Sequence, residues 1–270
     1  LELSTFSLLI KKLELKEMKT FGSMEPSFIG KFLLLLVSVG LGRGKLKGYF
    51  SKAWRKLRLR SPVDVVYNGL KFRLFVNGNT IETKMLFSSR IREKLELNAL
   101  KNFLPEDGVF IDVGANVGYY SLHIAHNTEC RVIAIEPNPK LVKRLKYNAT
   151  FNGLQDKIEI WKVALGDHSG IARLHLGITD LGSSSIINAE RDGVFIDVKI
   201  SPLIDLLTSN AVRRIDALKI DVEGVEDKVL KPFFEMAHQS FYPGMLIIED
   251  SSKASWEWDV IDWMLSNGYE

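Results

Sequence analysis

The sequence predicts an α/β fold, in which a mostly parallel sheet carries helices on both faces. First, apolar strand-like runs alternate with amphipathic helix-like segments from about residue 108 onward. Second, a glycine-rich turn at residues 114–118 directly follows one of these strands. Third, acidic residues stand where strands are expected to end, and ligands of such sheets bind beyond the carboxyl ends of the strands. A ligand site is therefore expected at that edge.

The hydrophobic periodicity gives the order of elements in the main domain, residues 106–270. Strands are expected at 109–113, 131–136, 158–163, 215–221 and 244–249, and helices at 118–126, 139–150, 202–209, 225–238 and 255–266. Residues 171–176 and 194–200 are expected to form a strand pair that is inserted after the third core strand.

A hairpin and a helix are expected to cap this sheet from residues 61–105. Asn68-Gly69 joins two alternating apolar runs, which is the signal of a two-residue hairpin turn. An apolar helical stripe then stops before Pro105, and it consists of Ile91, Leu95, Ala99, Leu100 and Phe103. Glu96 on this helix either approaches the ligand or faces solvent.

Residues 1–60 form a basic N-terminal extension. They hold 13 Lys and Arg against 4 Asp and Glu, whereas residues 61–270 hold 23 against 29. The apolar run at 32–41 is much shorter than the roughly 20 residues of a transmembrane helix. We expect either a helix that packs on the domain with a solvated basic face, or peripheral membrane contact through residues 28–60. Met24 is a candidate start, in which case residues 1–23 are expected to be either non-native or poorly ordered.

Composition also limits the compartment and the partners. Cys130 is the only cysteine, so an internal disulfide is excluded and a cytoplasmic protein is expected, with the membrane surface as the alternative. The main domain is acidic and lacks an Asn/Asp-Pro-Pro-Tyr/Phe motif. Both features argue against a nucleic-acid partner.

The turn after the first core strand is a candidate cofactor loop. Gly114, Asn116 and Gly118 tolerate positive φ and let the backbone approach a ligand. Asp112 would repel the pyrophosphate of a dinucleotide, but it suits a cationic amino group. Glu136 ends the next strand about 20 residues later, where a ribose-binding acid is expected, although it could instead cap the following helix. Together these features indicate S-adenosylmethionine.

Four motifs in the same order make the resemblance specific. They are Phe110-Ile-Asp-Val-Gly-Ala-Asn-Val-Gly-Tyr-Tyr-Ser121, Ile135-Glu-Pro-Asn138, Val163-Ala-Leu-Gly-Asp167 and Leu218-Lys-Ile-Asp-Val-Glu-Gly224. From about residue 90 onward, the chain resembles the FkbM family of S-adenosylmethionine-dependent methyltransferases. The resemblance implies a class I methyltransferase (Rossmann-like) fold and O-methylation of a sugar, glycolipid or other hydroxylated small molecule. Class I enzymes usually carry two more C-terminal strands, so we expect either a truncated chain or a sheet of five core strands.

The loop, the strand ends and the resemblance together define the candidate cofactor site. Its residues are Asp112, Gly114, Ala115, Asn116, Gly118, Tyr119, Glu136, Pro137, Ala164, Leu165 and Asp167. The segment from 112 to 119 is assigned to the methionine end, Glu136 to both ribose hydroxyls, and Ala164 and Leu165 to the adenine. Asp167 either accepts a hydrogen bond from the adenine amino group or forms a turn.

The candidate catalytic residues are Asp221, Glu223 and Glu249. Asp221 and Glu223 end one expected strand, and Glu249 and Asp250 end the next, so their carboxylates should meet at one edge. They could supply a general base and acceptor contacts, a magnesium or manganese site, or helix caps. A divalent metal is not favoured, and no metal ligands are assigned. Lys219 either reaches this pocket or faces solvent.

Three smaller groups complete the expectations. Ser183, Ser184 and Ser185 are placed near the acceptor by the resemblance. His123 and His126 are expected to be a partly exposed pair rather than metal ligands, and three tryptophans are expected to pack the last helix: Trp256, Trp258 and Trp263. The alternative function is a degenerate cofactor-binding domain that acts as an interaction module without turnover.

Overall fold

The computed structural model describes residues 19–41, 46–76, 78–88, 93–177, 185–186 and 194–270. At its centre, the described residues form a five-stranded, fully parallel sheet in the order β11-β10-β3-β4-β5. The strands are β3 (Val109–Val113), β4 (Arg131–Ile135), β5 (Ile158–Trp161), β10 (Ala217–Ile220) and β11 (Met245–Ile248). The core therefore has the five strands that the periodicity predicts.

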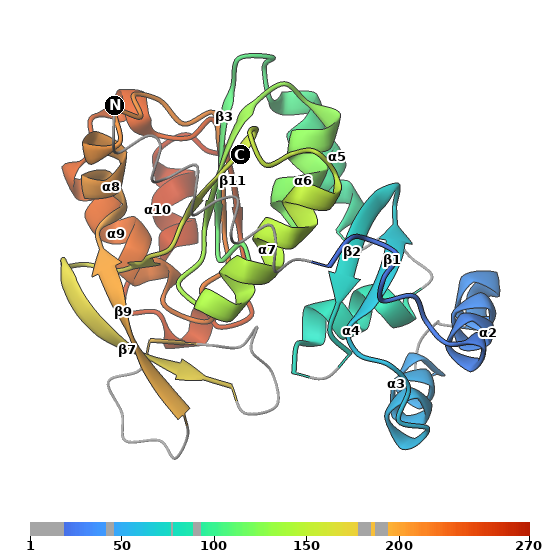
Figure 1. Ribbon diagram of the computed structural model, residues 1–270. Helices are drawn as coiled ribbons and strands as arrows, with labels where there is room; N and C mark the ends of the chain where they lie inside the picture. Colours follow the sequence, from blue (N-terminus) through green and yellow to red (C-terminus); the bar gives the residue numbers. More distant parts are fainter. Residues whose placement is uncertain (1–18, 42–45, 77, 89–92, 178–184, 187–193) are drawn as a thin grey trace, which may run out of the picture.

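Helices cover both faces of this sheet (Figure 1). They are α5 (Lys94–Phe103), α6 (Tyr119–Asn127) and α7 (Pro139–Phe151) on one face, and α8 (Leu203–Ser209), α9 (Glu226–Met236) and α10 (Val260–Ser266) on the other. Alternate residues of β3 explain the two layers, because Phe110 belongs to the core under the first helices and Ile111 to the core under the second. The predicted α/β fold is confirmed.

A second sheet follows the third core strand. It contains β6 (Ala164–Leu165), β9 (Val194–Ser201), β7 (Gly170–Leu176) and β8 (Ser185–Ile186), in that order. β7 and β9 are antiparallel, which confirms the inserted strand pair. The predicted strand 158–163 is too long, because the chain leaves the central sheet after Trp161 and Ala164 pairs with Ile200 of β9 instead.

Two helix predictions need correction. The last helix begins at Val260 rather than at 255, because the Asp259 side chain caps it and accepts from the amides of Ile261 and Asp262 at 3.1 Å. A separate 3₁₀ turn, η4 (Lys253–Ser255), precedes it. On α5 the predicted apolar stripe is partly wrong: Leu100 is buried as predicted, but Leu95 is 82% exposed and Leu97 is buried in its place. Ile91, the first residue of the predicted stripe, lies outside the described residues.

The predicted hairpin is confirmed as β1 (Val63–Tyr67) and β2 (Leu70–Leu74). Both residues of its turn have positive φ, 50° for Asn68 and 81° for Gly69, as a two-residue hairpin turn requires. The hairpin packs on α7, where the Asn148 side chain accepts from the Arg73 amide at 2.9 Å. The hairpin therefore supports α7, the helix that follows β4.

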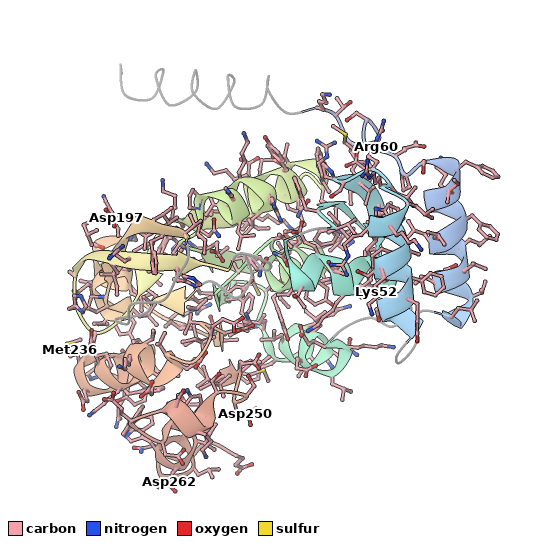
Figure 2. The ribbon with its side chains drawn as sticks, turned by 90° about the horizontal axis from the view of Figure 1, so that it is seen from below. Lys52, Arg60, Asp197, Met236, Asp250 and Asp262 are labelled. Atoms are coloured by element: carbon pink, nitrogen blue, oxygen red, sulfur yellow. The ribbon has the colours of Figure 1, made fainter. Side chains whose placement is uncertain are left out.

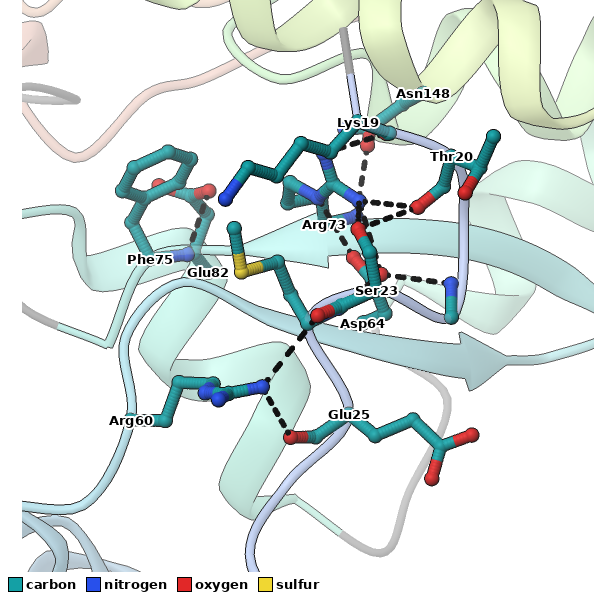
Figure 3. A network of polar contacts seen from close by, with 12 residues as sticks. Lys19, Thr20, Ser23, Glu25, Arg60, Asp64, Arg73, Phe75, Glu82 and Asn148 are labelled. Atoms are coloured by element: carbon teal, nitrogen blue, oxygen red, sulfur yellow. Dashed lines mark hydrogen bonds and ion pairs between the residues drawn. The ribbon is translucent and has the colours of Figure 1, made fainter.

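A network of polar contacts connects residues 19–24 to this hairpin (Figure 3). Arg73 and Asp64 form a buried ion pair, with Nε 2.7 Å from Oδ1. The Arg73 guanidinium also donates to the carbonyls of Lys19 and Thr20, both at 3.0 Å. Since every polar group of this buried pair has a partner nearby, residues 19–24 are held in a defined place.

Two N-terminal helices lie beyond the hairpin, at the edge of the molecule farthest from α8 and α9 (Figure 1). They are α2 (Phe28–Leu36), which runs into a π-helical turn η1 (Val37–Leu41), and α3 (Leu46–Lys56). α3 packs through buried Trp54, whose ring meets Phe87 of α4 (Thr80–Phe87) with centroids 5.7 Å apart. Within the described ranges, every helix falls short of the length and apolar character needed to cross a bilayer.

Candidate active site

The glycine-rich turn lies at the carboxyl end of β3 and passes close to the end of β10. Gly114, Asn116 and Gly118 all have positive φ, at 74°, 52° and 88°. A Cβ on Gly114 would lie 1.9 Å from the carbonyl oxygen of Asp221. Only glycine therefore lets the two strand ends approach this closely.

Asp112 is buried beside this turn, and one of its two carboxylate oxygens makes no hydrogen bond. Its Oδ2 accepts from the Ser121 amide at 3.1 Å and from the Ser121 hydroxyl at 2.6 Å. Its Oδ1 has no hydrogen-bond partner in the part of the chain that the structure describes. Burial raises the pKa of Asp112 and outweighs the nearby charge of Lys219 and the Ser121 contacts. A buried carboxylate oxygen without a hydrogen bond is the kind of group that a bound cationic donor would satisfy.

Lys219 lies beside Asp112 on the neighbouring strand. Its Nζ is 3.7 Å from Asp112 Oδ1 and 3.5 Å from Asp221 Oδ2, and its side chain is 8% exposed. Burial alone would lower the pKa of Lys219, but the charges of Asp221 and Asp112 raise it, so the ammonium stays charged. The ammonium also lies 5.4 Å from the centre of the Tyr120 ring. Of the two predicted positions for Lys219, the structure shows the one at the pocket.

Glu136 follows β4 and is almost completely buried. Its Oε2 accepts from the Asn116 amide at 2.9 Å, and its Oε1 accepts from the Asn138 amide at 2.8 Å. Burial raises the pKa of Glu136 to about 7, against the lowering effect of these two amides. The helix that follows is capped by the Asn138 side chain, so helix capping does not explain Glu136.

The turn after β10 carries the two leading catalytic candidates. Glu223 adopts a φ of 58°, a left-handed conformation that is uncommon outside glycine, and Gly224 follows at 97°. The buried carboxylate of Glu226 holds this turn, because it accepts from the Val222 amide at 2.9 Å and from the Gly224 amide at 3.2 Å. Such a fixed, unusual backbone is typical of a functional site.

Two adjacent cavities open at this edge of the sheet. The first has a volume of about 60 Å³ and is lined by Glu136, Pro137, Ala164 and Leu165, among others. The second has a volume of about 320 Å³ and holds most of the charged side chains. Five residues line both cavities: Ile81, Gly114, Asn116, Asp221 and Glu223. The structure thus brings the candidate cofactor and catalytic residues to one place.

Most of the predicted site residues line at least one of the two cavities. Those that do are Asp112, Gly114, Ala115, Asn116, Tyr119, Glu136, Pro137, Ala164, Leu165, Asp221, Glu223 and Glu249. Gly118 lines neither and serves as the N-cap of α6. Asp167 is exposed and bonded to His168 Nδ1 at 2.6 Å, which favours its role in a turn. Asp250 lines neither cavity, and Ser183, Ser184 and the side chain of Ser185 lie outside the described residues.

The sequence interpretation missed one wall of the site, which α4 supplies. Ile81 lines both cavities, and Thr80 and Lys84 line the second. Asn79 caps this helix and donates from Nδ2 to Asn116 Oδ1 at 2.7 Å, so it fixes the glycine-rich turn. The sequence signal that could have revealed α4 is Asn79, an asparagine directly before a helix-forming segment. Next to α5, its N-cap residue Glu93 lines the second cavity, whereas Glu96 within the helix lines neither cavity.

The two histidines of α6 do not form the partly exposed pair that the spacing predicts. His123 is buried, and only His126 is exposed. Burial, with a smaller contribution from His126, lowers the pKa of His123 to about 4, so its ring is neutral. Among the described residues, no three His, Cys, Asp or Glu side chains are arranged to hold a metal ion.

The parallel sheet, the glycine turn after β3 and the buried acid after β4 define a class I methyltransferase domain. Residues 112–270 match the family described as Methyltransferase FkbM domain, which is more than half of the chain. The chain belongs to the FkbM methyltransferase family.

Three individual proteins illustrate the similarity. The methyltransferase sdnD of Sordaria araneosa is 25% identical over 158 residues, 47% of this chain and 61% of that protein. The tRNA(Phe) (4-demethylwyosine(37)-C(7)) aminocarboxypropyltransferase of Pyrococcus horikoshii is 28% identical over 140 residues, 51% of this chain and 47% of that protein. The solved structure of precorrin 8W decarboxylase from Methanobacterium thermoautotrophicum is 15% identical and covers 67% of this chain and 75% of that chain, with a TM-score of 0.41. The chain thus spans less than two thirds of both sequence relatives.

Proposed function

We propose that the chain is an S-adenosylmethionine-dependent O-methyltransferase that acts on a hydroxyl of a sugar, glycolipid or other small molecule. One observation carries the proposal: Asp221 and Glu223 line both cavities and so stand at their junction. Methyl transfer needs a donor and an acceptor side by side, with a proton acceptor where they meet. The arrangement supplies that position.

The residues of the site fit the cofactor. Asp112 Oδ1 would accept from the amino group at the methionine end, and Glu136 offers two oxygens to the ribose hydroxyls. Ala164 and Leu165 provide an apolar wall for the adenine. When it is bound, S-adenosylmethionine supplies an electrophilic methyl group on a sulfonium. The protein then has to hold, align and exclude water from the reacting atoms.

In the proposed reaction, the protein has to remove the proton from the acceptor hydroxyl. When an acceptor hydroxyl took the methyl group, the displaced sulfur would keep the electrons of the broken carbon–sulfur bond, and the hydroxyl proton would pass to a carboxylate of this chain. We assign that carboxylate to Asp221 or Glu223, with Glu249 in the same cavity as an acceptor-binding group. A divalent cation held by these oxygens is the alternative way to acidify the hydroxyl.

The charge of the second cavity supports a hydroxylated acceptor rather than a nucleic acid. Its lining includes five carboxylate residues and two lysines: Glu93, Asp112, Asp221, Glu223, Glu249, Lys84 and Lys219. Carboxylates accept hydrogen bonds from hydroxyl groups but repel phosphates. Membrane contact by residues 28–60 stays a prediction that does not depend on this chemistry.

The test is transfer of labelled methyl from S-adenosylmethionine to a panel of sugars, glycolipids, small alcohols and tRNA. We expect turnover on a hydroxylated small molecule. The Asp221→Asn and Glu223→Gln variants should bind the cofactor normally, yet at least one should lose about 10²–10⁴-fold in turnover, as removal of a general base does. Loss of activity with a chelator would assign the role to a metal. If the protein binds the cofactor but methylates none of the panel members, the result would favour the alternative function, a degenerate cofactor-binding domain that acts as an interaction module.

A further inference from the structure

One side of α2 is apolar and exposed. The exposed fractions are 87% for Phe28, 54% for Phe32, 58% for Leu35 and 69% for Val39 in the following turn. These residues are three or four positions apart, so they share one side of the helix. We call these four residues the α2 apolar face. A row of large apolar side chains in water marks an interaction site.

The opposite side of α2 already faces the protein. Gly30 is buried there, and a Cβ on it would lie 2.9 Å from Cη2 of Trp54. Val37 is buried, and Leu33 and Leu34 pack against the same core. Figure 2 shows α2 at the outer edge of the molecule, with side chains that point away from the rest of the chain. The α2 apolar face therefore points outward, away from the core contacts of the helix.

Basic residues accompany this face. Between residues 26 and 63 the sequence holds nine Lys and Arg and no Asp or Glu. Lys52, Arg55 and Lys56 on α3 are exposed, and in the described part of the chain none of them pairs with a carboxylate. Figure 2 labels Lys52 on α3, the helix beside α2, and Arg60 just beyond its end. The surroundings of the α2 apolar face are thus strongly cationic.

We propose that the α2 apolar face rests on an anionic membrane surface, with the cations of α3 and Arg60 against the lipid headgroups. α2 is nine residues long, far below the roughly 20 that span a bilayer, so it would lie on the surface. The cations near the α2 apolar face favour a membrane over a second copy of the chain as its binding partner. In a symmetric contact with a second copy, the same surface faces itself and would bring two sets of unpaired cations together. An anionic bilayer accepts the apolar side chains and the cations at once.

Sedimentation of the whole chain with lipid vesicles tests the proposal without cofactor or turnover, so its outcome is separate from that of the proposed chemistry. We expect binding to vesicles of phosphatidylcholine and phosphatidylserine in a ratio of about 7 to 3, weak binding to phosphatidylcholine alone, and release at high salt. The double variant Phe28→Ser, Phe32→Ser should bind at least about tenfold more weakly. A matched control changes exposed apolar residues elsewhere, Ile171→Ser with Val194→Ser, and should bind like the wild type.

The charges are tested in the same way. Lys52→Glu with Lys56→Glu should weaken anionic binding, whereas Lys101→Glu with Lys231→Glu, on α5 and α9, should not. Equal binding by the wild type and the Phe28/Phe32 variant, or no binding by the wild type, overturns the proposal. A dimer in solution that the same phenylalanine substitutions dissolve, together with no vesicle binding, would assign the face to a second copy and also overturn it.

Discussion

Lys219 and Asp112 occupy paired positions on β10 and β3, with the Lys219 ammonium 3.7 Å from the Asp112 carboxylate. The same ammonium lies 3.5 Å from Oδ2 of Asp221, which directly follows β10. One buried cation therefore links the acid assigned to the cofactor with an acid assigned to catalysis. Removing one partner of such a group leaves a buried charge without compensation.

Lys219→Met should therefore destabilise the protein by about 3–5 kcal/mol at pH 8. Burial already raises the pKa of Asp112, and the loss of the Lys219 charge would raise it further. The cost of the buried Asp112 charge is therefore present at high pH and is relieved as the pH falls through the folded pKa. Urea unfolding at pH 8 and pH 5 measures the difference. In the Lys219→Met background, Asp112→Asn should restore part of the loss, and strictly additive effects would contradict the coupling.

Gly114→Ala should cost more than Gly153→Ala, although both glycines have left-handed φ, at 74° and 68°. A Cβ on Gly153 meets nothing within 4 Å, so the change costs only the backbone strain, about 1–2 kcal/mol. A Cβ on Gly114 would lie 1.9 Å from the Asp221 carbonyl and must push the two strand ends apart. Thermal unfolding should show the larger loss for Gly114→Ala, and calorimetry should show weaker cofactor binding for that variant alone. Equal effects would mean that the close approach is unimportant.

His123 should make the protein less stable in acid. Burial lowers the pKa of His123 to about 4 from an ordinary value of 6.5. Below pH 6.5 His123 binds a proton in the unfolded chain but not in the folded chain. The free energy of unfolding is therefore unaffected by His123 above pH 6.5 and decreases as the pH falls toward 4. The loss approaches about 3 kcal/mol, at 1.36 kcal/mol for each pKa unit. Urea unfolding of His123→Leu between pH 7 and pH 4.5 should show a flatter dependence, while exposed His126→Leu should follow the wild type.

The residues at strand ends were predictable from the sequence. Asp112 and Glu136 each follow an apolar run, and the carboxyl ends of parallel strands meet at one edge whatever the detailed packing. Asn116 was recognisable because few residues other than glycine tolerate positive φ. These features depend on local sequence and on topology, both of which the periodicity reports.

The walls of the site depend on tertiary packing and were not predictable in the same way. α4 has apolar residues on several sides and no clear stripe, so periodicity does not reveal it. Alternation could not place Lys219, because a central parallel strand is buried on both faces and each alternate position faces a core. On α5 the predicted stripe includes Leu95 and leaves out Leu97, but the structure exposes Leu95 and buries Leu97. The position at which the helix begins determines which of its sides faces the core, and the stripe alone does not fix that position.

The most direct test of the cofactor assignment is titration calorimetry with S-adenosylmethionine and with NAD on the wild type and on Glu136→Ala. The wild type should bind S-adenosylmethionine and not NAD, and Glu136→Ala should bind at least about tenfold more weakly, because it lacks a charged acceptor for the ribose hydroxyls. Wild-type affinity should also fall by about tenfold from pH 8 to pH 6, since Glu136, with a pKa of about 7, takes up a proton on one acceptor oxygen. Tight binding of NAD without binding of S-adenosylmethionine would contradict the account.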